Sequence, residues 1–390
     1  MNVMENFYMA LINRELQPLV EKQTPPKAVV VFGPRRVGKT TLLREIAKGT
    51  TVSWYNGDNP EDIDRLELRS AGDLLTVLHQ ADTLVIDEAQ RFPNIGLTLK
   101  RLVDANETET KPTRIFVTGS SSLDLAKGVK ESAVGRLVMR QMWPLSITEL
   151  AADRGWGEVS QKIDQLMVYG LYPNIVTFPE DARITLQDYV DGILFKDLFA
   201  LSGIRHNTKF EHLVRLLAFN VGAEVSYEGL ARDTGLNKTT VMDYITLLEQ
   251  CFIVKVCGSF SRNLSNELKK GKKVYFCDNG IRNAIIGNFS PMSARDDAGA
   301  LWENFFFMER VKLHDTRQDF TQLYFWRTTG RTPHELDFIE VTDGVMKAFE
   351  CKVNPKAKAK SRDEFLAAYP GCKIQVVSPR DLMKIWAPAR

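Results

Sequence analysis

The sequence has few of the residues from which metal centres and disulfide frameworks are built. Its 390 residues include five cysteines and five histidines, scattered along the chain. The cysteines, at positions 251, 257, 277, 351 and 372, show no C-x-x-C spacing. This pattern excludes a zinc ribbon and a disulfide framework, and it predicts reduced, buried thiols.

Long apolar runs and a strong excess of one charge are also lacking. No apolar stretch approaches the roughly 18 residues that a membrane span needs, and the N-terminus has no basic start before an apolar run. We therefore expect a cytoplasmic protein without a membrane segment. The formal net charge of +2 argues neither for nor against a nucleic-acid partner. A chain of this length is expected to form two to four domains.

The most informative segment is residues 28–49, where an apolar run leads into GPRRVGKT and then a helix-forming stretch. This is the P-loop in its strand, loop and helix context, and it predicts binding of a nucleoside triphosphate such as ATP. Gly33 and Gly38 free the loop of side chains, so that its N–H groups can point at the phosphates. Lys39 would contact the β- and γ-phosphates, and the Thr40 hydroxyl would bind Mg²⁺. The predicted nucleotide-binding residues are Gly33, Pro34, Arg35, Arg36, Val37, Gly38, Lys39, Thr40 and Thr41.

Two further apolar runs end in polar residues that suit phosphate chemistry. The run LVIDEAQ places Asp87 and Glu88 at the carboxyl edge of a strand, where ligands of open α/β sheets bind. Asp87 would hold Mg²⁺ directly or through water, and Glu88 would orient or deprotonate the attacking water. The run IFVTGSSS predicts a donor beside the γ-phosphate, with Ser120 preferred and Thr118 or Ser121 as alternatives. These serines could instead cap the next helix.

The alternation of apolar runs and helical patterns divides the chain into four regions. Residues 1–145 alternate strands with helices and predict an α/β fold with a doubly wound parallel sheet. Residues 146–205 are helical in pattern and predict a small lid. Residues 206–290 read as helix, short helix, turn, helix and two extended segments, which is the order of a winged helix. Residues 291–390 predict a last α/β unit.

Several segments together resemble one family. GPRRVGKTTL, LVIDEAQ, FVTGSSSL, AVGRL with WPLS, and GLYP are similar to segments of bacterial and archaeal AAA-superfamily ATPases. The C-terminal half of those proteins is a domain of unknown function that combines a winged helix with a PD-(D/E)XK-nuclease-like unit, which has a restriction-endonuclease-like fold. The resemblance implies that Arg136 is an arginine finger acting in a neighbouring subunit, and hence that the protein is a homo-oligomer. Arg136 could instead be a solvated cation at a helix end.

The winged-helix region carries the predicted DNA contacts. The N-terminal end of the helix over residues 237–250 is polar, and such ends reach base edges in helix-turn-helix docking. The KKGKK turn would be the wing tip and contact phosphates. A protein-binding module with a solvated loop is the alternative. The predicted DNA-binding residues are Asn237, Lys238, Thr239, Thr240, Lys269, Lys270, Lys272 and Lys273.

The C-terminal region contains a strong hairpin signal. If Asp343-Gly344 is a two-residue type I′ loop, then Thr342 pairs with Val345. Counting back in this register places Asp337 directly opposite Glu350. Two carboxylates facing each other about 5 Å apart repel unless a cation lies between them. A divalent metal is the natural candidate.

The order Glu303, Asp337, Glu350 and Lys352 resembles the PD-(D/E)XK nuclease pattern, although Leu336 stands where that pattern has proline. By this resemblance the three carboxylates would bind Mg²⁺, and Lys352 would steady the attacking hydroxide or the phosphorane charge. The region could be an active nuclease or a nuclease-like DNA-binding fold with little or no cleavage. It could also be a plain surface, a solvent-facing edge where Glu335 pairs with Lys352 and Asp337 is exposed.

The sequence therefore predicts a Mg²⁺-dependent ATPase that couples ATP binding or hydrolysis to engagement of duplex or branched DNA. Four-way junctions are named as a branched substrate only because the C-terminal residues are similar to those of junction-cleaving nucleases. The alternatives are an ATP-gated nuclease and an ATP-dependent signalling switch whose winged helix binds a protein.

Overall fold

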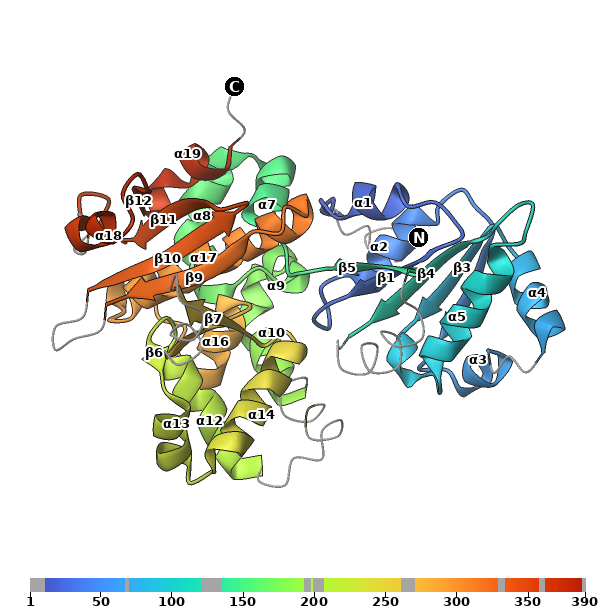
Figure 1. The fold of residues 1–390 in the computed structure, drawn as a ribbon, viewed down its shortest axis with the longest axis horizontal. Helices are drawn as coiled ribbons and strands as arrows, with labels where there is room; N and C mark the ends of the chain where they lie inside the picture. Colours follow the sequence, from blue (N-terminus) through green and yellow to red (C-terminus); the bar gives the residue numbers. More distant parts are fainter. Residues whose placement is uncertain are drawn as a thin grey trace, which may run out of the picture. The chain divides into compact units, whose positions relative to one another are not determined.

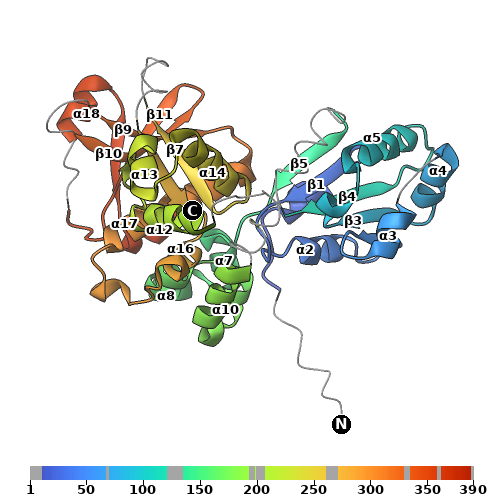
Figure 2. The same cartoon turned by 90° about the horizontal axis from the view of Figure 1, so that it is seen from below.

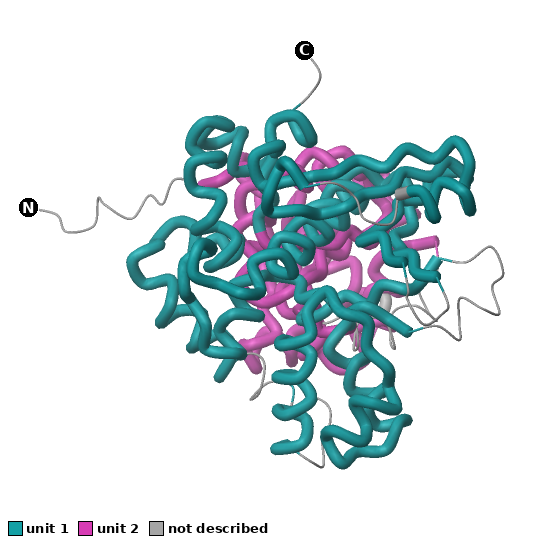
Figure 3. Tube along the Cα trace, turned by 90° about the vertical axis from the view of Figure 1, so that its left-hand side faces the viewer, with its two compact units in different colours: residues 1–10, 145–249, 253–390 teal, residues 11–144, 250–252 magenta. Residues whose placement is uncertain are grey.

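The computed structural model describes residues 11–66, 70–120, 135–192, 198, 207–260, 271–328, 334–357 and 362–387 (Figure 1). The chain divides into two compact units (Figure 3). The N-terminal unit comprises residues 11–144 and 250–252, and the C-terminal unit includes residues 145–249 and 253–390. None of the helices in the described ranges is both long and apolar enough to cross a membrane.

The N-terminal unit is built on a five-stranded parallel sheet with strand order β2-β3-β4-β1-β5. The predicted α/β fold with a parallel sheet is confirmed. The inner strands β1, β3 and β4 are apolar runs buried nearly throughout, as expected of a parallel sheet covered on both faces. The strands are β1 (Ala28–Phe32), β2 (Val52–Asn56), β3 (Thr83–Asp87), β4 (Arg114–Gly119) and β5 (Leu137–Gln141).

Helices cover both faces of this sheet, and Figure 2 shows α2 and α5 on opposite sides. One face is covered by α4 and α5, whose Leu74, Leu78, Leu99 and Leu102 join the buried cluster of the strands. A capping box between Ser70 and Asp73 begins α4. The helices are α1 (Gln17–Glu21), α2 (Lys39–Ile46), α3 (Pro60–Arg65), α4 (Ala71–His79) and α5 (Ile95–Asn106), with the 3-10 turn η1 (Ala89–Arg91).

The C-terminal unit is built on a seven-stranded sheet with strand order β12-β11-β10-β9-β7-β8-β6. Its strands are β6 (Glu224–Val225), β7 (Val254–Ser259), β8 (Lys272–Phe276), β9 (Gln322–Arg327), β10 (Glu335–Thr342), β11 (Val345–Cys351) and β12 (Lys373–Val377). β6, β7 and β8 pair antiparallel, and β7 runs parallel to β9. Strands from residues 206–290 and strands from residues 291–390 therefore belong to one sheet. The predicted winged-helix and C-terminal regions are thus joined through one sheet, and the domain boundary at residue 290 stays a prediction.

The helices of this unit follow the predicted order. α12 (Asn207–Phe219), β6, α13 (Tyr227–Thr234), α14 (Lys238–Gln250), β7 and β8 succeed one another along the chain. α17 (Ala298–Arg317) is buried around most of its surface and brings Trp302, Phe306 and Phe307 into the core, as expected of a central helix. The remaining helices are α16 (Asn279–Ile286), α18 (Arg362–Ala368) and α19 (Leu382–Trp386), with 3-10 turns η4 (Met292–Ala294) and η5 (Pro379–Asp381).

The helices of the predicted lid belong to the C-terminal unit. They are α7 (Ile147–Arg154), α8 (Trp156–Tyr169), α9 (Pro173–Thr177) and α10 (Ala182–Tyr189), with η2 (Pro179–Asp181) between the last two. Buried amides fix them to α16, because Asn279 donates to the Met167 carbonyl at 2.9 Å and Asn283 to the Val168 carbonyl at 2.7 Å. These helices are thus part of the core of the C-terminal unit and not a separate lid domain.

The predicted hairpin register is confirmed. Thr342 pairs with Val345, and the ladder continues to the pair of Phe338 with Phe349. Both loop residues have positive φ, +49° at Asp343 and +79° at Gly344, as a type I′ turn requires.

The five cysteines are free, in agreement with the prediction of reduced thiols. Burial is confirmed for three of them, Cys257, Cys277 and Cys351, whereas Cys251 and Cys372 are partly exposed.

Candidate functional site

The P-loop joins β1 to α2 and can only be built with glycine at its first position. A Cβ on Gly33 would lie 2.0 Å from the carbonyl oxygen of Met142, and φ at this residue is +153°. Gly38 is the N-cap residue just before α2 and has φ of +95°. Arg14 anchors the loop from outside, because its guanidinium donates to the Val37 carbonyl at 2.6 Å and to the Trp143 carbonyl at 2.6 Å. The Arg14 side chain thus helps to hold the loop in shape through a backbone carbonyl.

Lys39 is a buried cation at the start of α2. Its side chain is 5% exposed, and Nζ donates to the carbonyl oxygens of Gly33 at 3.0 Å and Pro34 at 2.7 Å. Burial lowers the pKa of Lys39 from 10.5 to about 8, although the nearby carboxylates of Glu88 and Asp87 oppose the shift. Carbonyl groups solvate the ammonium without neutralising it. An anion such as a phosphate would supply the missing charge.

Asp87 lies at the carboxyl end of β3 and meets two threonine hydroxyls. Thr40 Oγ1 donates to its carboxylate oxygens at 3.1 and 3.0 Å, and Thr118 Oγ1 donates to Oδ1. The structure thus brings the two predicted Mg²⁺ ligands, Thr40 and Asp87, into direct contact. A carboxylate and a hydroxyl are the oxygen ligands that Mg²⁺ takes beside water and phosphate, so this donor set fits the ion.

Glu88 and Ser120 are linked through Gln90, which the sequence analysis did not single out. Gln90 Nε2 donates to Glu88 Oε2 at 2.5 Å and to Ser120 Oγ at 2.9 Å. The Ser120 amide donates back to Gln90 Oε1 at 3.3 Å. The run DEAQ places Gln90 two positions after Glu88, but the sequence does not encode which way its side chain turns. Ser121, the alternative to Ser120, lies outside the described residues.

Arg136 lies away from this site. It precedes β5, and its carbonyl accepts from the amide of Ala28 at the start of β1 (3.1 Å), whereas the P-loop follows the end of β1. Arg136 is thus at the sheet edge opposite the P-loop. Its guanidinium pairs with Asp104 on α5, with Nη2 at 3.3 Å from Oδ2. Arg136 therefore cannot serve the site of its own chain from this position.

The polar start of α14 is exposed as predicted. Asn237, Lys238 and Thr239 are exposed and Thr240 is partly exposed. Asn237 Oδ1 accepts from the Thr240 amide at 2.7 Å, and Lys238 Nζ lies 2.5 Å from Glu228 Oε1. Their predicted DNA contacts remain predictions.

The predicted wing tip is wrong for Lys273. Its side chain is fully buried in β8, with Nζ 2.9 Å from Glu303 Oε1 and 2.6 Å from Glu335 Oε1. Because side chains alternate along a strand, Lys273 points to the core while Lys272 remains partly exposed. Lys269 and Lys270 lie outside the described residues.

Lys273 is held as a cation between carboxylates. Burial opposes its charge, but Glu303 and Glu335 outweigh burial and raise the pKa of Lys273 above its ordinary value. Burial raises the pKa of Glu303 to about 7, against the influence of Lys273. Tyr275 also donates to Glu303 Oε1 at 2.6 Å. Two donors on one carboxylate oxygen favour its ionised form, so we treat Lys273 and Glu303 as an ion pair at neutral pH.

The second half of the predicted metal site is also paired with lysine. Lys352 Nζ lies 2.7 Å from Glu350 Oε1 and 3.9 Å from Asp337 Oδ2. The Cys351 amide donates to Asp337 Oδ2 at 2.6 Å. Burial raises the pKa of Asp337 and of Glu350. Glu350 Oε2 is buried without a hydrogen-bond partner.

The predicted three-carboxylate metal site is wrong. No group of three or more His, Cys, Asp or Glu side chains converges as a metal-binding set within the ranges that the structure describes. The facing carboxylates do need cations between them, as predicted, but the cations are the ammonium groups of Lys273 and Lys352. The exposed pair of Glu335 with Lys352, the plain-surface alternative, is not formed either, since Glu335 pairs with Lys273.

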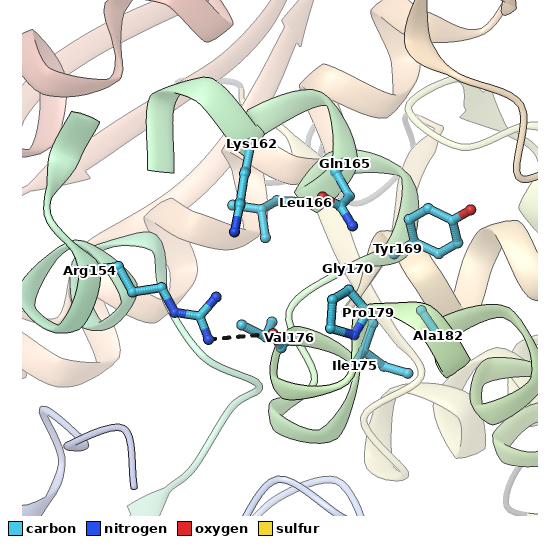
Figure 4. A pocket seen from close by; sticks show the side chains of 10 residues that line it. All are labelled: Arg154, Lys162, Gln165, Leu166, Tyr169, Gly170, Ile175, Val176, Pro179 and Ala182. Carbon is cyan, nitrogen blue, oxygen red and sulfur yellow. Dashed lines mark hydrogen bonds between the residues drawn. The ribbon is translucent and has the colours of Figure 1, made fainter. Parts of the chain in front are cut away.

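A small cavity lies among α8, α9 and α10 (Figure 4) and has a volume of about 40 Å³. Two cations line it. Lys162 pairs with Glu158 at 2.8 Å, and Arg154 pairs with Asp153 at 3.4 Å and donates to the Val176 carbonyl at 3.4 Å. Pockets for nucleotide-sized ligands have volumes of about 300 Å³ or more, so this cavity is too small for one.

Comparison with known families divides the chain into three parts. Residues 25–151 match a family described as an AAA domain. Residues 160–292 match a domain of unknown function (DUF8612), and residues 298–384 match another (DUF4143). The second match spans both the helices α8 to α10 and the element order α12 to β8, in line with their shared unit.

Similar proteins come from bacteria and archaea. An uncharacterized protein of Mycobacterium tuberculosis is 28% identical over 330 residues, which cover 83% of this chain and 70% of that protein. An uncharacterized protein of Methanocaldococcus jannaschii is 25% identical over 323 residues, which cover 77% of this chain and 69% of that protein.

Among solved structures, a Walker-type ATPase of Pyrococcus abyssi is similar with a TM-score of 0.50 at 14% identity. The match covers 71% of this chain and 96% of that protein. At this level of identity the likeness shows a shared fold. Residues 25–151 therefore match an AAA domain, the chain shares a fold with a Walker-type ATPase, and two regions that match domains of unknown function follow.

Proposed function

We propose that this protein hydrolyses ATP at the P-loop with Mg²⁺ and couples the nucleotide state to binding of DNA. The observation that supports ATP hydrolysis most strongly is the convergence of Lys39, Thr40 and Asp87 at the end of β1 and β3. Together they offer a cation and two oxygen ligands, which is what a nucleotide with Mg²⁺ requires.

Each residue has a distinct task in this proposal. The loop N–H groups and Lys39 bind the phosphates, and the helix N-terminus behind them adds its dipole. Thr40 and Asp87 hold Mg²⁺, which neutralises phosphate charge when bound. Glu88 orients the attacking water and accepts its proton, while Ser120 donates to the γ-phosphate. Because all these groups come from rigid strand ends and one helix start, little rearrangement is needed on binding.

Arg136 would complete the site of a neighbouring copy of the chain. Its place at the opposite sheet edge supports action in trans over action in cis. The ion pair with Asp104 is about one-third exposed on both sides and is therefore weak enough to break.

Arg136→Ala should abolish hydrolysis and spare ATP binding. Mixing it with Glu88→Gln protein should restore some activity, because mixed oligomers contain interfaces with every required group. Full activity of Arg136→Ala alone would contradict this role.

The proposed DNA contact rests on α14. The region from α12 to β8 has the element order of a winged helix, and the exposed residues at the start of α14 suit contacts in a groove. The pair of Lys238 with Glu228 is exposed on both sides, so a phosphate could replace Glu228 at small cost. Lys272, partly exposed at the start of β8, is a candidate phosphate contact.

The function is tested by measuring the ATPase rate without DNA and with duplex, single-stranded and four-way-junction DNA. Glu88→Gln should retain ATP binding and stall turnover. Substituting Ala for Asn237, Lys238 and Thr239 should weaken DNA binding and remove any DNA stimulation. Thr246→Ala, exposed further along α14, is the matched control. Stimulation that survives the triple substitution would rule out the start of α14 as the DNA contact.

The salt dependence of binding separates DNA from a protein partner. If Lys272 contacts a phosphate, Lys272→Ala should flatten the slope of log affinity against log salt by about one unit. Absence of DNA binding, with ATP hydrolysis retained, would favour the signalling switch.

A further inference from the structure

Gln90 stands between Glu88, proposed to orient the attacking water, and Ser120, proposed to contact the γ-phosphate. It lies in η1, two residues after Glu88, and contacts Ser120 at the end of β4. Three hydrogen bonds use its whole amide group: one to Glu88, one to the Ser120 hydroxyl and one from the Ser120 amide. The 2.5 Å bond to Glu88 joins a neutral donor to a carboxylate, which is the stronger class of hydrogen bond.

The backbone around Gln90 is fixed, so that its side chain sets the distance between Glu88 and Ser120. Glu88 has φ of +50°, and its amide donates to Thr118 Oγ1 at 3.1 Å. Gly57 packs so closely on this turn that a Cβ would lie 2.4 Å from the Glu88 carbonyl oxygen. The turn closes with the Arg91 amide donating to the Glu88 carbonyl at 3.0 Å.

The hydroxyl of Ser120 and the carboxylate of Glu88 can each keep the hydrogen bond to Gln90 and still make a second contact. A serine hydroxyl has one donor hydrogen and two acceptor lone pairs, so Ser120 can accept from Gln90 while donating to a phosphate oxygen. A carboxylate has two oxygens, so Glu88 can accept from Gln90 at Oε2 and use Oε1 to hold a water. One amide therefore keeps the water-binding group in register with the phosphate-binding group.

We propose that Gln90 is a positioning residue for ATP hydrolysis: its amide ties the Glu88 carboxylate to Ser120, so that the attacking water is aligned only when Ser120 contacts the γ-phosphate. This inference rests on the proposed ATPase function. It adds a residue that acts through Glu88 and Ser120 and does not itself touch the nucleotide.

Kinetics of Gln90→Ala test the proposal. Loss of a hydrogen bond to a charged group corresponds to a fall in kcat of about 10- to 100-fold. ATP affinity should change less than about threefold, because Gln90 makes no phosphate contact. Arg91→Ala is the control, since Arg91 lies in the same turn but pairs with exposed Asp58 at 2.7 Å. An unchanged kcat in Gln90→Ala would overturn the proposal.

A double-substitution cycle distinguishes positioning from general disturbance. If Gln90 acts through Ser120, the pair Gln90→Ala and Ser120→Ala should lower kcat about as much as the larger single change. Multiplying effects would overturn the link between the two residues.

Hydrogen exchange keeps the test independent of turnover. Because the Ser120 amide donates to Gln90, its exchange should be at least about fivefold faster in Gln90→Ala and unchanged in Arg91→Ala. A wild-type protein that binds but does not hydrolyse ATP would contradict the proposed function. Unchanged exchange at Ser120 in Gln90→Ala would contradict the placement of Gln90 itself.

Discussion

Lys39 in the N-terminal unit and Lys273 in the C-terminal unit are both buried, and they differ in what surrounds them. Lys39 in the N-terminal unit donates to two backbone carbonyls, and burial lowers its pKa to about 8. Lys273 in the C-terminal unit lies between Glu303 and Glu335, and its pKa is raised. Both side chains are at most 5% exposed, so burial alone does not distinguish them.

The difference shows how a buried cation reveals its role. A charge that the chain itself neutralises belongs to the fold, because removing it leaves carboxylates unpaired. A buried charge whose hydrogen bonds go to carbonyl groups, with carboxylates only nearby, is incompletely neutralised and costs stability until an anion binds; this cost is typical of a binding site. Lys39 is thus prepared for a ligand, whereas Lys273 is part of the sheet.

The largest expected effect is a loss of folding stability when Lys273 is replaced. Lys273→Met should lower the free energy of unfolding by about 3–5 kcal/mol, because Glu303 and Glu335 lose their buried counter-ion. Urea unfolding of the full chain measures this loss. Lys272→Met, on the same strand but partly exposed, is the control and should change stability little. Replacing Glu303 by Gln together with Lys273→Met should recover part of the loss. Wild-type stability in Lys273→Met would show that these carboxylates do not depend on the lysine.

The second-largest expected effect is a loss of ATP affinity, without a loss of stability, when Lys39 is replaced. Lys39→Ala should weaken ATP binding by at least about 100-fold, or roughly 2.7 kcal/mol, because the phosphates lose their cation. The unliganded variant should be no less stable than the wild type, since the fold disfavours the charge. Calorimetric titration and thermal unfolding measure the two quantities. Lys48→Ala removes an exposed, paired lysine near the same helix and should change neither. If Lys39→Ala bound ATP as tightly as the wild type, the assignment of residues 33–41 as a nucleotide-binding P-loop would be contradicted.

The third effect is a pH dependence that the two lysines should not share. Unliganded Lys39 has a pKa of about 8, and phosphate favours its charged form. ATP affinity should therefore be constant below that pH and fall above it, approaching about tenfold per pH unit. The raised pKa of Lys273 keeps its ion pairs intact over the same range. Titrations from pH 7 to pH 9.5 with Mg²⁺ held constant would show this. A flat profile would contradict a neutral-dipole environment for Lys39.

The smallest effect concerns metal at the acidic residues of the C-terminal unit. Millimolar Mn²⁺ should leave the melting temperature of nucleotide-free protein unchanged, because lysines occupy the places between the carboxylates. Asp87→Asn protein is the sample to use, because this change weakens the proposed Mg²⁺ site of the N-terminal unit and leaves the C-terminal carboxylates as the metal ligands under test. A rise in melting temperature that Asp337→Asn abolishes would show that metal displaces these lysines.

The N-terminal site was predictable from sequence because its parts are local. The glycine spacing, Lys39 and Thr40 lie within one strand, loop and helix, and Asp87 ends an apolar run that could only be an inner strand. Parallel strands place their carboxyl ends at one edge, so these residues had to meet. Gln90 escaped prediction because its partners depend on which way a glutamine side chain turns, and no spacing rule encodes that. The hairpin register was equally local, since a two-residue turn fixes every pair behind it.

The C-terminal cluster was decided by pairings between distant segments. In sequence, KKGKK indicates a solvated basic turn, and Lys273 looks like its neighbours. Only the pairing of β7 with β9, which joins three strands to four, sets Lys273 on β8 near α17 and β10. By itself the sequence determined the nucleotide site, because local conformation and strand polarity suffice for it. The tertiary structure alone decided that two lysines stand among the carboxylates in place of a metal, because charges far apart in the chain find their counter-ions only when the sheet forms.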